Sequence, residues 1–224
     1  MALEEALDRL QQFRGSSLAA TIADIESRLG SADTARVGDV NLAFGIDLKL
    51  LQSAIAVKTA AAQIDVVLHA TAILNCLPYL LEEDEVVEKL SLGAGNAASD
   101  FDLETSRCIA EFKFIHWQGG SEAVRKKTLF QDFYKLVREP TAKLKYLYLL
   151  NTKIPLRFLR SKRDVLKVLD RNRRLADDFV ERYGKTYHTV GEFYEAHKGE
   201  VRLVNLVDLI PQLDIMASVT VDEG

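Results

Sequence analysis

Two runs in the middle of the chain, residues 100–104 and 109–116, alternate between charged and apolar side chains. Successive side chains of a strand point to opposite faces of its sheet, so a two-residue period predicts two β-strands. Asp100, Asp102 and Glu104 would then share one face of the first strand. The pattern requires a fold that contains a sheet, and it concentrates charge on one side of a β-hairpin.

The predicted hairpin has a two-residue loop at positions 106–107. In that register Asp102 lies directly opposite Glu111 and Asp100 lies directly opposite Lys113. Directly opposed side chains have Cβ atoms about 5 Å apart. We therefore expect the carboxylates of Asp102 and Glu111 to lie close enough to share one ion.

The other face of the hairpin is apolar. The same register pairs Phe101 with Phe112 and Leu103 with Ala110, and we expect this face to pack on the core. A slip of one residue would place Phe101 opposite Glu111, so burial of apolar surface favours the first register. Because the hairpin lies between helices and carries bulky apolar residues, its second run is predicted to be a central strand. The alternative is an edge strand whose charged face is simply solvated.

Two neighbouring carboxylates repel each other unless a positive charge lies between them. A hard cation such as Mg²⁺ (or Mn²⁺) would supply that charge at Asp102 and Glu111. It would act as a Lewis acid and lower the pKa of bound water. The ammonium group of Lys113, on the same face, could orient an attacking water or stabilise charge on a phosphate oxygen. These groups together predict phosphodiester hydrolysis.

The pattern Asp-Leu at 102–103, a short hairpin, Ile-Ala-Glu-Phe-Lys at 109–113 and a following basic helix resembles the core of the PD-(D/E)xK phosphodiesterases. This superfamily of restriction-endonuclease-like nucleases includes the Holliday-junction resolvases. The resemblance covers about residues 60–210. It implies an α/β fold, a restriction-endonuclease-like mixed sheet flanked by helices, here with an N-terminal helical extension.

The resemblance also implies roles for individual residues. Asp102 and Glu111 would be the metal ligands and Lys113 the catalytic lysine, and we expect Asp100 to assist at the metal. In relatives of this fold the helix after Glu-x-Lys often turns a basic or amide side chain toward the phosphate. Arg125 and Gln131 are the candidates for that role, and the alternative for both is an ordinary solvated helix face.

Beyond the hairpin, Ser121 is expected to cap a helix that runs to about Arg138 and packs its apolar face on the sheet. Residues 145–150 are a second apolar strand, and the strand, helix, strand order predicts a parallel crossover. Residues 153–174 contain nine Lys or Arg and two Asp. On a helix, much of this charge could contact phosphates, and the alternative is a basic helix that balances the acidic N-terminal part or a partner subunit. The phosphate-binding candidates there are Arg157, Arg160 and Arg163.

Helical spacing of leucine and isoleucine predicts helices over 2–14 and 17–29. Residues 31–45 are polar and read as a loop or short extended segment, and residues 82–89 as an acidic turn of helix or a linker. The last part of the chain is predicted to be helix, turn, helix and a final strand before Pro211. The expected organisation is an N-terminal helical extension, a nuclease-like domain and a flexible tail, over residues 1–45, 46–215 and 216–224.

An Ala-rich helix is predicted from about Ile46 to Cys76, ended by Pro78. The apolar run at 63–81 is interrupted by polar residues, so we expect a buried helix and no membrane span. The small side chains of 54–62 suit close helix packing, within the fold or against a second copy. A homodimer through this helix is therefore one expectation.

The 224-residue chain is 48% hydrophobic, enough for one substantial core with a helical extension. A net charge of −4 is not that of a protein that coats nucleic acid without specificity, so any polyanion must meet a local basic patch. Two cysteines without metal-ligand spacing, and an acidic N-terminus without signal-peptide features, favour a cytoplasmic setting.

We therefore expect a Mg²⁺-dependent nuclease that acts on nucleic acid, with DNA as the first candidate substrate and RNA as the second. A second expectation is a catalytically inactive nuclease-like module that binds nucleic acid or protein. A third is an all-helical adaptor in which the central runs form no hairpin.

Overall fold

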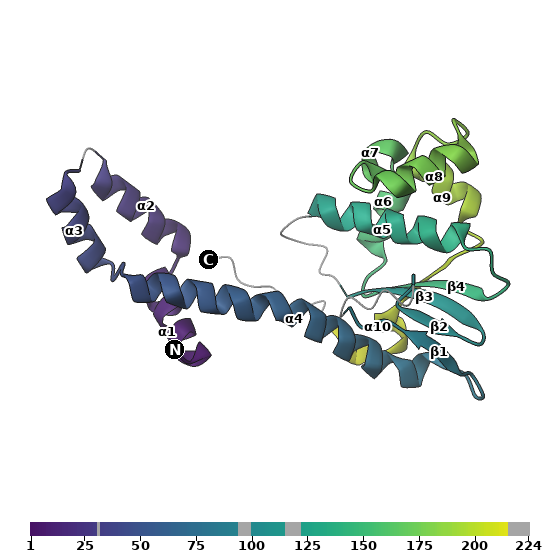
Figure 1. Ribbon diagram of the computed structural model, residues 1–224, viewed down its shortest axis with the longest axis horizontal. Coiled ribbons are helices and arrows are strands. Elements are labelled where there is room, and N and C mark those ends of the chain that lie inside the picture. Colours follow the sequence, from purple (N-terminus) through teal and green to yellow (C-terminus); the bar gives the residue numbers. More distant parts are fainter. Residues whose placement is uncertain (31, 94–99, 115–121, 215–224) are drawn as a thin grey trace. The chain divides into compact units, whose positions relative to one another are not determined.

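The computed structural model describes residues 1–30, 32–93, 100–114 and 122–214 (Figure 1). The chain folds into two compact units, and the boundary between them falls between Val67 and Leu68, inside one long helix. Each unit is described separately below.

The N-terminal unit is helical. Two of its helices fall where leucine spacing predicts them, and Ser17 caps the second by accepting a hydrogen bond from the N–H of Ala20. The third was expected to be a loop, and that prediction is wrong. The side chain of Asp33 caps this helix by accepting from the N–H of Arg36, at 2.9 Å. The unit consists of α1 (Leu3–Arg14), α2 (Leu18–Leu29), α3 (Thr34–Ala43) and the first part of α4 (Leu48–Leu80).

Helix α4 extends beyond its predicted end at Cys76, to Leu80. Pro78 lies in the last turn, where the N–H that proline lacks costs the helix a single hydrogen bond. Ala72, Ile73 and Cys76 are buried, but neighbouring positions on the helix are exposed. The prediction of a buried helix is therefore correct for one face only.

By length and composition α4 is also apolar enough to cross a bilayer, a property that core helices of soluble proteins share. In the part of the helix within the N-terminal unit, Leu48, Leu51 and Ile55 are exposed, Leu48 by 76%. The prediction of a buried helix concerned residues 63–81, and this exposed apolar stripe was not predicted from the sequence.

The second unit contains a five-stranded mixed sheet, so the all-helical alternative is wrong. The strands lie in the order β1-β2-β3-β4-β5, antiparallel from β1 to β3 and parallel from β3 to β5. The acidic segment 82–89, expected to be a turn of helix or a linker, instead contributes most of β1. The strands are β1 (Val87–Leu90), β2 (Leu103–Thr105), β3 (Cys108–Lys113), β4 (Leu144–Leu149) and β5 (Arg202–Asn205).

The hairpin of β2 and β3 forms in the predicted register, with Leu103 opposite Ala110 and a loop at 106–107. Strand β3 is central and buried on both faces, so the edge-strand alternative is wrong. The predicted pairing of Phe101 with Phe112 is also wrong. A bend at residues 100–102 precedes β2, and Phe101 packs with the core on the opposite face of the sheet from Leu103 and Phe112.

Helix α5 (Glu122–Arg138) connects β3 to the parallel strand β4, as predicted. Phe130, Phe133 and Leu136 are buried, whereas Val124 in the first turn of the helix is 42% exposed. The basic segment 153–174 forms several short elements and not one helix. These helices cover the α5 side of the sheet and are α6 (Lys153–Leu159), α7 (Val165–Leu169), α8 (Arg173–Tyr183) and α9 (Val190–His197) (Figure 1).

The opposite face of the sheet packs against the C-terminal part of α4 and against α10 (Leu206–Leu209), which is followed by a 3-10 turn at Pro211–Leu213.

The final strand that the sequence predicts before Pro211 is β5. Helix α9 begins with a capping box, in which Thr189 accepts from the N–H of Glu192 and Glu192 accepts from the N–H of Thr189. Ser121 and the predicted tail 216–224 lie outside the described residues.

Candidate metal centre

Asp102 lies at the bend directly before β2, while Glu111 and Lys113 lie on β3. The carboxylate Oδ2 of Asp102 accepts a hydrogen bond from the backbone N–H of Phe112, at 2.8 Å. Phe112 is the residue between Glu111 and Lys113. The hairpin register and this hydrogen bond together bring the three predicted catalytic residues to one part of the sheet.

Glu111 and Lys113 share the face of β3 that packs against α5, where they meet a carboxylate from that helix. The ammonium nitrogen of Lys113 lies 2.9 Å from Oδ2 of Asp132 and 3.6 Å from Oε2 of Glu111. Glu111 is 5% exposed and Asp132 is 4% exposed. Ionisable side chains this deeply buried are rare unless they are paired. The cluster of Glu111, Lys113 and Asp132 is therefore a specific feature of the fold.

The cluster holds more negative charge than Lys113 alone neutralises. Burial, followed by the charges of Asp132 and Asp102, raises the pKa of Glu111 to about 9, although Lys113 opposes this. Burial would lower the pKa of Lys113, but Asp132, Glu111 and Asp102 raise it above its ordinary value. The ammonium group therefore stays charged. An added cation would favour the ionised form of Glu111.

The pKa of Asp102 changes in the opposite direction to that of Glu111. Burial would raise it, but a hydrogen bond from His69, the charge of Lys113 and the N–H of Phe112 together lower it below the ordinary value. Asp102 is thus held as a carboxylate near neutral pH. Two carboxyl groups with opposite pKa shifts in one cluster are typical of functional sites.

The donor set suits a hard cation. Asp102 and Glu111 offer carboxylate oxygens, the ligands that Mg²⁺ and Mn²⁺ prefer. Within residues 1–30, 32–93, 100–114 and 122–214, no group of three or more His, Cys, Asp or Glu side chains is arranged to hold a metal. Mg²⁺ is commonly bound through one or two carboxylates and retains several waters. The chemistry of these two side chains therefore fits such an ion. The β2–β3 ladder ends at Leu103 and Ala110, one pair short of the predicted pairing of Asp102 with Glu111.

Sequence reasoning did not identify Asp132. The signal for it was an acidic residue inside the apolar stripe of α5, between Leu129 and Phe133, which are both fully buried. An aspartate at a core position needs a buried partner of opposite charge. Its second oxygen, Oδ1, lies 3.5 Å from the ammonium nitrogen of Lys135, one turn further along α5.

His69 of α4 was also not assigned to the site. Its Nε2 lies 3.4 Å from Oδ1 of Asp102, and its ring lies edge-on to Phe114 with centroids 6.1 Å apart. No spacing in the sequence signals this contact, since 33 positions separate His69 from Asp102. Only the packing of α4 on the sheet brings them together.

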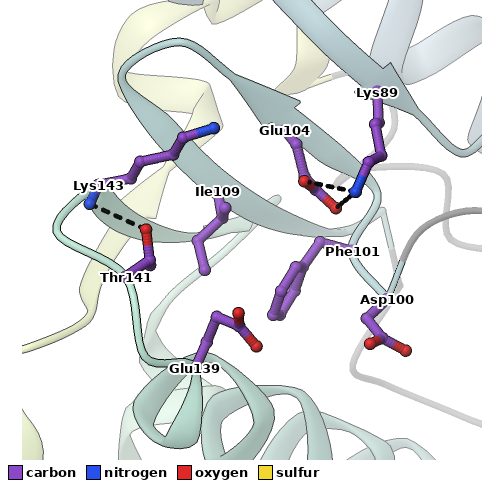
Figure 2. Close-up of a pocket in the computed structure, with 8 residues that line it drawn as sticks. All are labelled: Lys89, Asp100, Phe101, Glu104, Ile109, Glu139, Thr141 and Lys143. Atoms are coloured by element: carbon purple, nitrogen blue, oxygen red, sulfur yellow. Dashed lines mark hydrogen bonds and ion pairs between the residues drawn. The ribbon is translucent and has the colours of Figure 1, made fainter.

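Asp100 lies apart from the pairing that was expected for it. The β2–β3 ladder pairs Leu103 with Ala110 and Glu104 with Ile109, and does not extend back to Asp100. The side chain of Asp100 instead lines a separate polar hollow of about 250 Å³. Figure 2 shows this hollow beside the end of α5 and the ion pair of Lys89 with Glu104, at 3.1 Å.

The predicted nucleic-acid contacts lie on two elements. Arg125 and Gln131 are half-buried on α5, and Gln131 directly precedes Asp132. Arg157, Arg160 and Arg163 are exposed, at α6 and in the connection to α7, and Arg160 has a 3.7 Å ion pair with Glu195. The three arginines are thus exposed and close together in the sequence, with the buried Phe158 and Leu159 between the first two.

Comparisons of the chain with models of protein families, with curated proteins and with solved structures found no match. The geometry of the cluster is therefore the basis for any assignment of function.

Proposed function

We propose that this protein is a metal-dependent nuclease of the PD-(D/E)xK type, with a restriction-endonuclease-like fold, that hydrolyses phosphodiester bonds of DNA in preference to RNA. The observation that carries the proposal is the joining of Asp102 to the Glu111-Phe112-Lys113 segment of a buried central strand. The element order supports it, because the helix α4 and the meander β1 to β3 are followed by the crossover helix α5 and the parallel strand β4.

In the proposed reaction Asp102 and Glu111 hold a Mg²⁺ or Mn²⁺ ion, which would supply Lewis-acid activation of the phosphate and of water. Lys113 donates hydrogen bonds from its ammonium group to the attacking water or to a phosphate oxygen that gains charge. Its raised pKa keeps it a donor across the neutral range. The hydrogen bond from Phe112 fixes the orientation of Asp102 before substrate binds, which reduces the reorganisation that the reaction requires.

The substrate assignment depends on local charge. With a net charge of −4, the chain must bind a polyanion through a restricted patch. Arg157, Arg160 and Arg163 form the exposed patch that we assign to phosphates, and Arg125 and Gln131 of α5 lie on the helix that carries Asp132. DNA is the proposed substrate because the resemblance is to DNA-cleaving enzymes.

The direct test is cleavage of a labelled DNA with and without Mg²⁺ or Mn²⁺. We expect activity that EDTA abolishes, and loss of that activity in Asp102→Asn and Lys113→Met. Lys143→Met is the matched control, because Lys143 lines the separate hollow and pairs with Glu88 at 2.6 Å. Wild-type activity in both site variants would remove the assignment.

The alternative is a catalytically inactive nuclease-like module that binds nucleic acid or protein. The exposed apolar side chains of α4, among them Leu48, Leu51 and Ile55, favour it because such surfaces commonly bind other macromolecules. Calorimetric titration with Mn²⁺ separates the two functions. A nuclease binds the ion in a manner that Glu111→Gln abolishes, whereas the inactive module gives no such heat.

A further inference from the structure

Lys113 has two neighbouring carboxylates, and they are not equivalent. Its ammonium nitrogen is 2.9 Å from Asp132 on α5 but 3.6 Å from Glu111 on its own strand. Asp132 is itself held from a second side, since its other oxygen lies 3.5 Å from Lys135. The closer partner of Lys113 is therefore Asp132, a residue that was not predicted to be a metal ligand.

This arrangement addresses a conflict inside the proposed site. Side chains two residues apart on a strand project from the same face, so Lys113 and Glu111 are adjacent. Without another partner, the ammonium group would pair with Glu111 and compete with a cation for its oxygens. A buried ammonium group requires a partner of opposite charge. Asp132 supplies that partner from α5, the helix that covers this face of the sheet.

We propose that Asp132 is a positioning residue, which holds the ammonium group of Lys113 on the α5 side and leaves Glu111 free to bind the cation. The inference rests on the proposed function and adds to it a group that the Glu-x-Lys pattern does not contain. Asp132 acts through Lys113 and contacts neither metal nor substrate.

The test measures Mn²⁺ affinity by calorimetry and DNA cleavage by kinetics on the full chain. In Asp132→Asn the lysine should move to Glu111, so the Kd for Mn²⁺ should rise by about 10- to 100-fold, as is typical when a residue that orients a metal ligand is changed. kcat should fall while KM for DNA changes little, because Asp132 acts on Lys113 and is not one of the residues assigned to phosphate. Asp132→Glu, which keeps the charge, should restore part of both.

The decisive comparison repeats the substitution without the lysine. In a Lys113→Met background, Asp132→Asn should change the Kd for Mn²⁺ several-fold less than in the wild type, because no ammonium group remains to compete. Removing both charges also avoids an unpaired buried ion, so this double variant provides a folded protein if Asp132→Asn alone does not fold. Asp178→Asn, which alters another ion-paired carboxylate on a different helix, is the control for general loss of stability.

An equal effect of Asp132→Asn in both backgrounds, or no effect in either, would overturn the positioning role while the nuclease assignment stands. Failure of the wild-type protein to bind Mn²⁺ or to cleave DNA would overturn the proposed function, and the role of Asp132 with it.

Discussion

The carboxylate of Asp102 accepts a hydrogen bond from the backbone N–H of Phe112, with 2.8 Å between oxygen and nitrogen. The contact joins a residue that precedes β2 to the C-terminal end of β3, beyond the last residue pair of the β2–β3 ladder. Asp102 therefore substitutes for a strand partner at this point. One side chain serves both the fold and the proposed site.

This double role predicts a difference between two substitutions of Asp102. Asp102→Ala leaves the N–H of Phe112 without its acceptor and should lower the free energy of unfolding by about 1–3 kcal/mol. Asp102→Asn retains an oxygen acceptor and should lose less. Urea denaturation in EDTA measures both, and equal losses would show that the hydrogen bond contributes nothing to stability.

Cation binding should stabilise the folded protein. An ion that binds only the native state at 100 times its Kd adds about 2.7 kcal/mol to the free energy of unfolding. We therefore expect Mn²⁺ to raise the Tm by several degrees, EDTA to reverse the rise and Glu111→Gln to abolish it. Glu104→Gln, at the separate hollow, should respond as the wild type does. An undiminished Tm increase in Glu111→Gln would exclude Glu111 as a ligand.

Acid should weaken the contact between α5 and α8. Burial would raise the pKa of Asp178, but hydrogen bonds from Tyr134, Arg182 and Arg138 outweigh it and lower the pKa. A carboxyl with a lowered folded pKa stabilises the protein above its unfolded pKa of about 3.9. That stabilisation is lost as the pH falls through the folded value.

Asp178→Asn should accordingly reduce the free energy of unfolding by about 1 kcal/mol at pH 7 and by progressively less below pH 4. Chemical denaturation at a series of pH values measures this difference. A constant difference across that range would contradict the assignment of the effect to ionisation of Asp178.

DNA binding should depend on salt through the exposed arginines. Each phosphate contact contributes about 0.9 to the slope of log K against log salt for duplex DNA. Arg157→Glu and Arg163→Glu should each weaken binding and reduce the magnitude of the slope by about 1. Arg14→Glu on α1 is the charge-matched control. Fluorescence anisotropy at several salt concentrations measures the slopes, and unchanged slopes would exclude this patch.

The exposed stripe of α4 predicts a homodimer. Leu48, Leu51 and Ile55 recur at helical spacing, and apolar surface of this kind is commonly covered by a partner. Charges at Lys58 and Asp65 of the same helix make a lipid environment costly, which favours a second copy.

The double variant Leu51→Glu/Ile55→Glu should therefore be monomeric where the wild type is dimeric. Light scattering after size-exclusion chromatography measures the mass. Leu166→Glu, at an exposed apolar position of α7, should leave the dimer intact. A monomeric wild type at high micromolar concentration would contradict the prediction.

Sequence patterns predicted the elements whose signals are local. The register of Leu103 with Ala110 followed from the two-residue period, and the crossover helix from apolar spacing after residue 121. Helix α3 was missed because Gly38 and Gly45 indicate a loop, and strand β1 was missed because its segment is acidic. The Asp33 cap stabilises the helix, and pairing with β2 stabilises the strand. A helix cap and a pairing with another strand produce no periodic pattern of apolar residues that sequence analysis could detect.

For the candidate site, the sequence by itself determined that Asp102, Glu111 and Lys113 could share a hairpin, because strand alternation and a short loop act over a dozen residues. Only the tertiary structure decided that His69 and Asp132 join them. These residues reach the hairpin through the packing of α4 and α5 on opposite faces of the sheet. The side-chain period of one element carries no information about which residue of another packs against it, so this part of the site depends on the folded core.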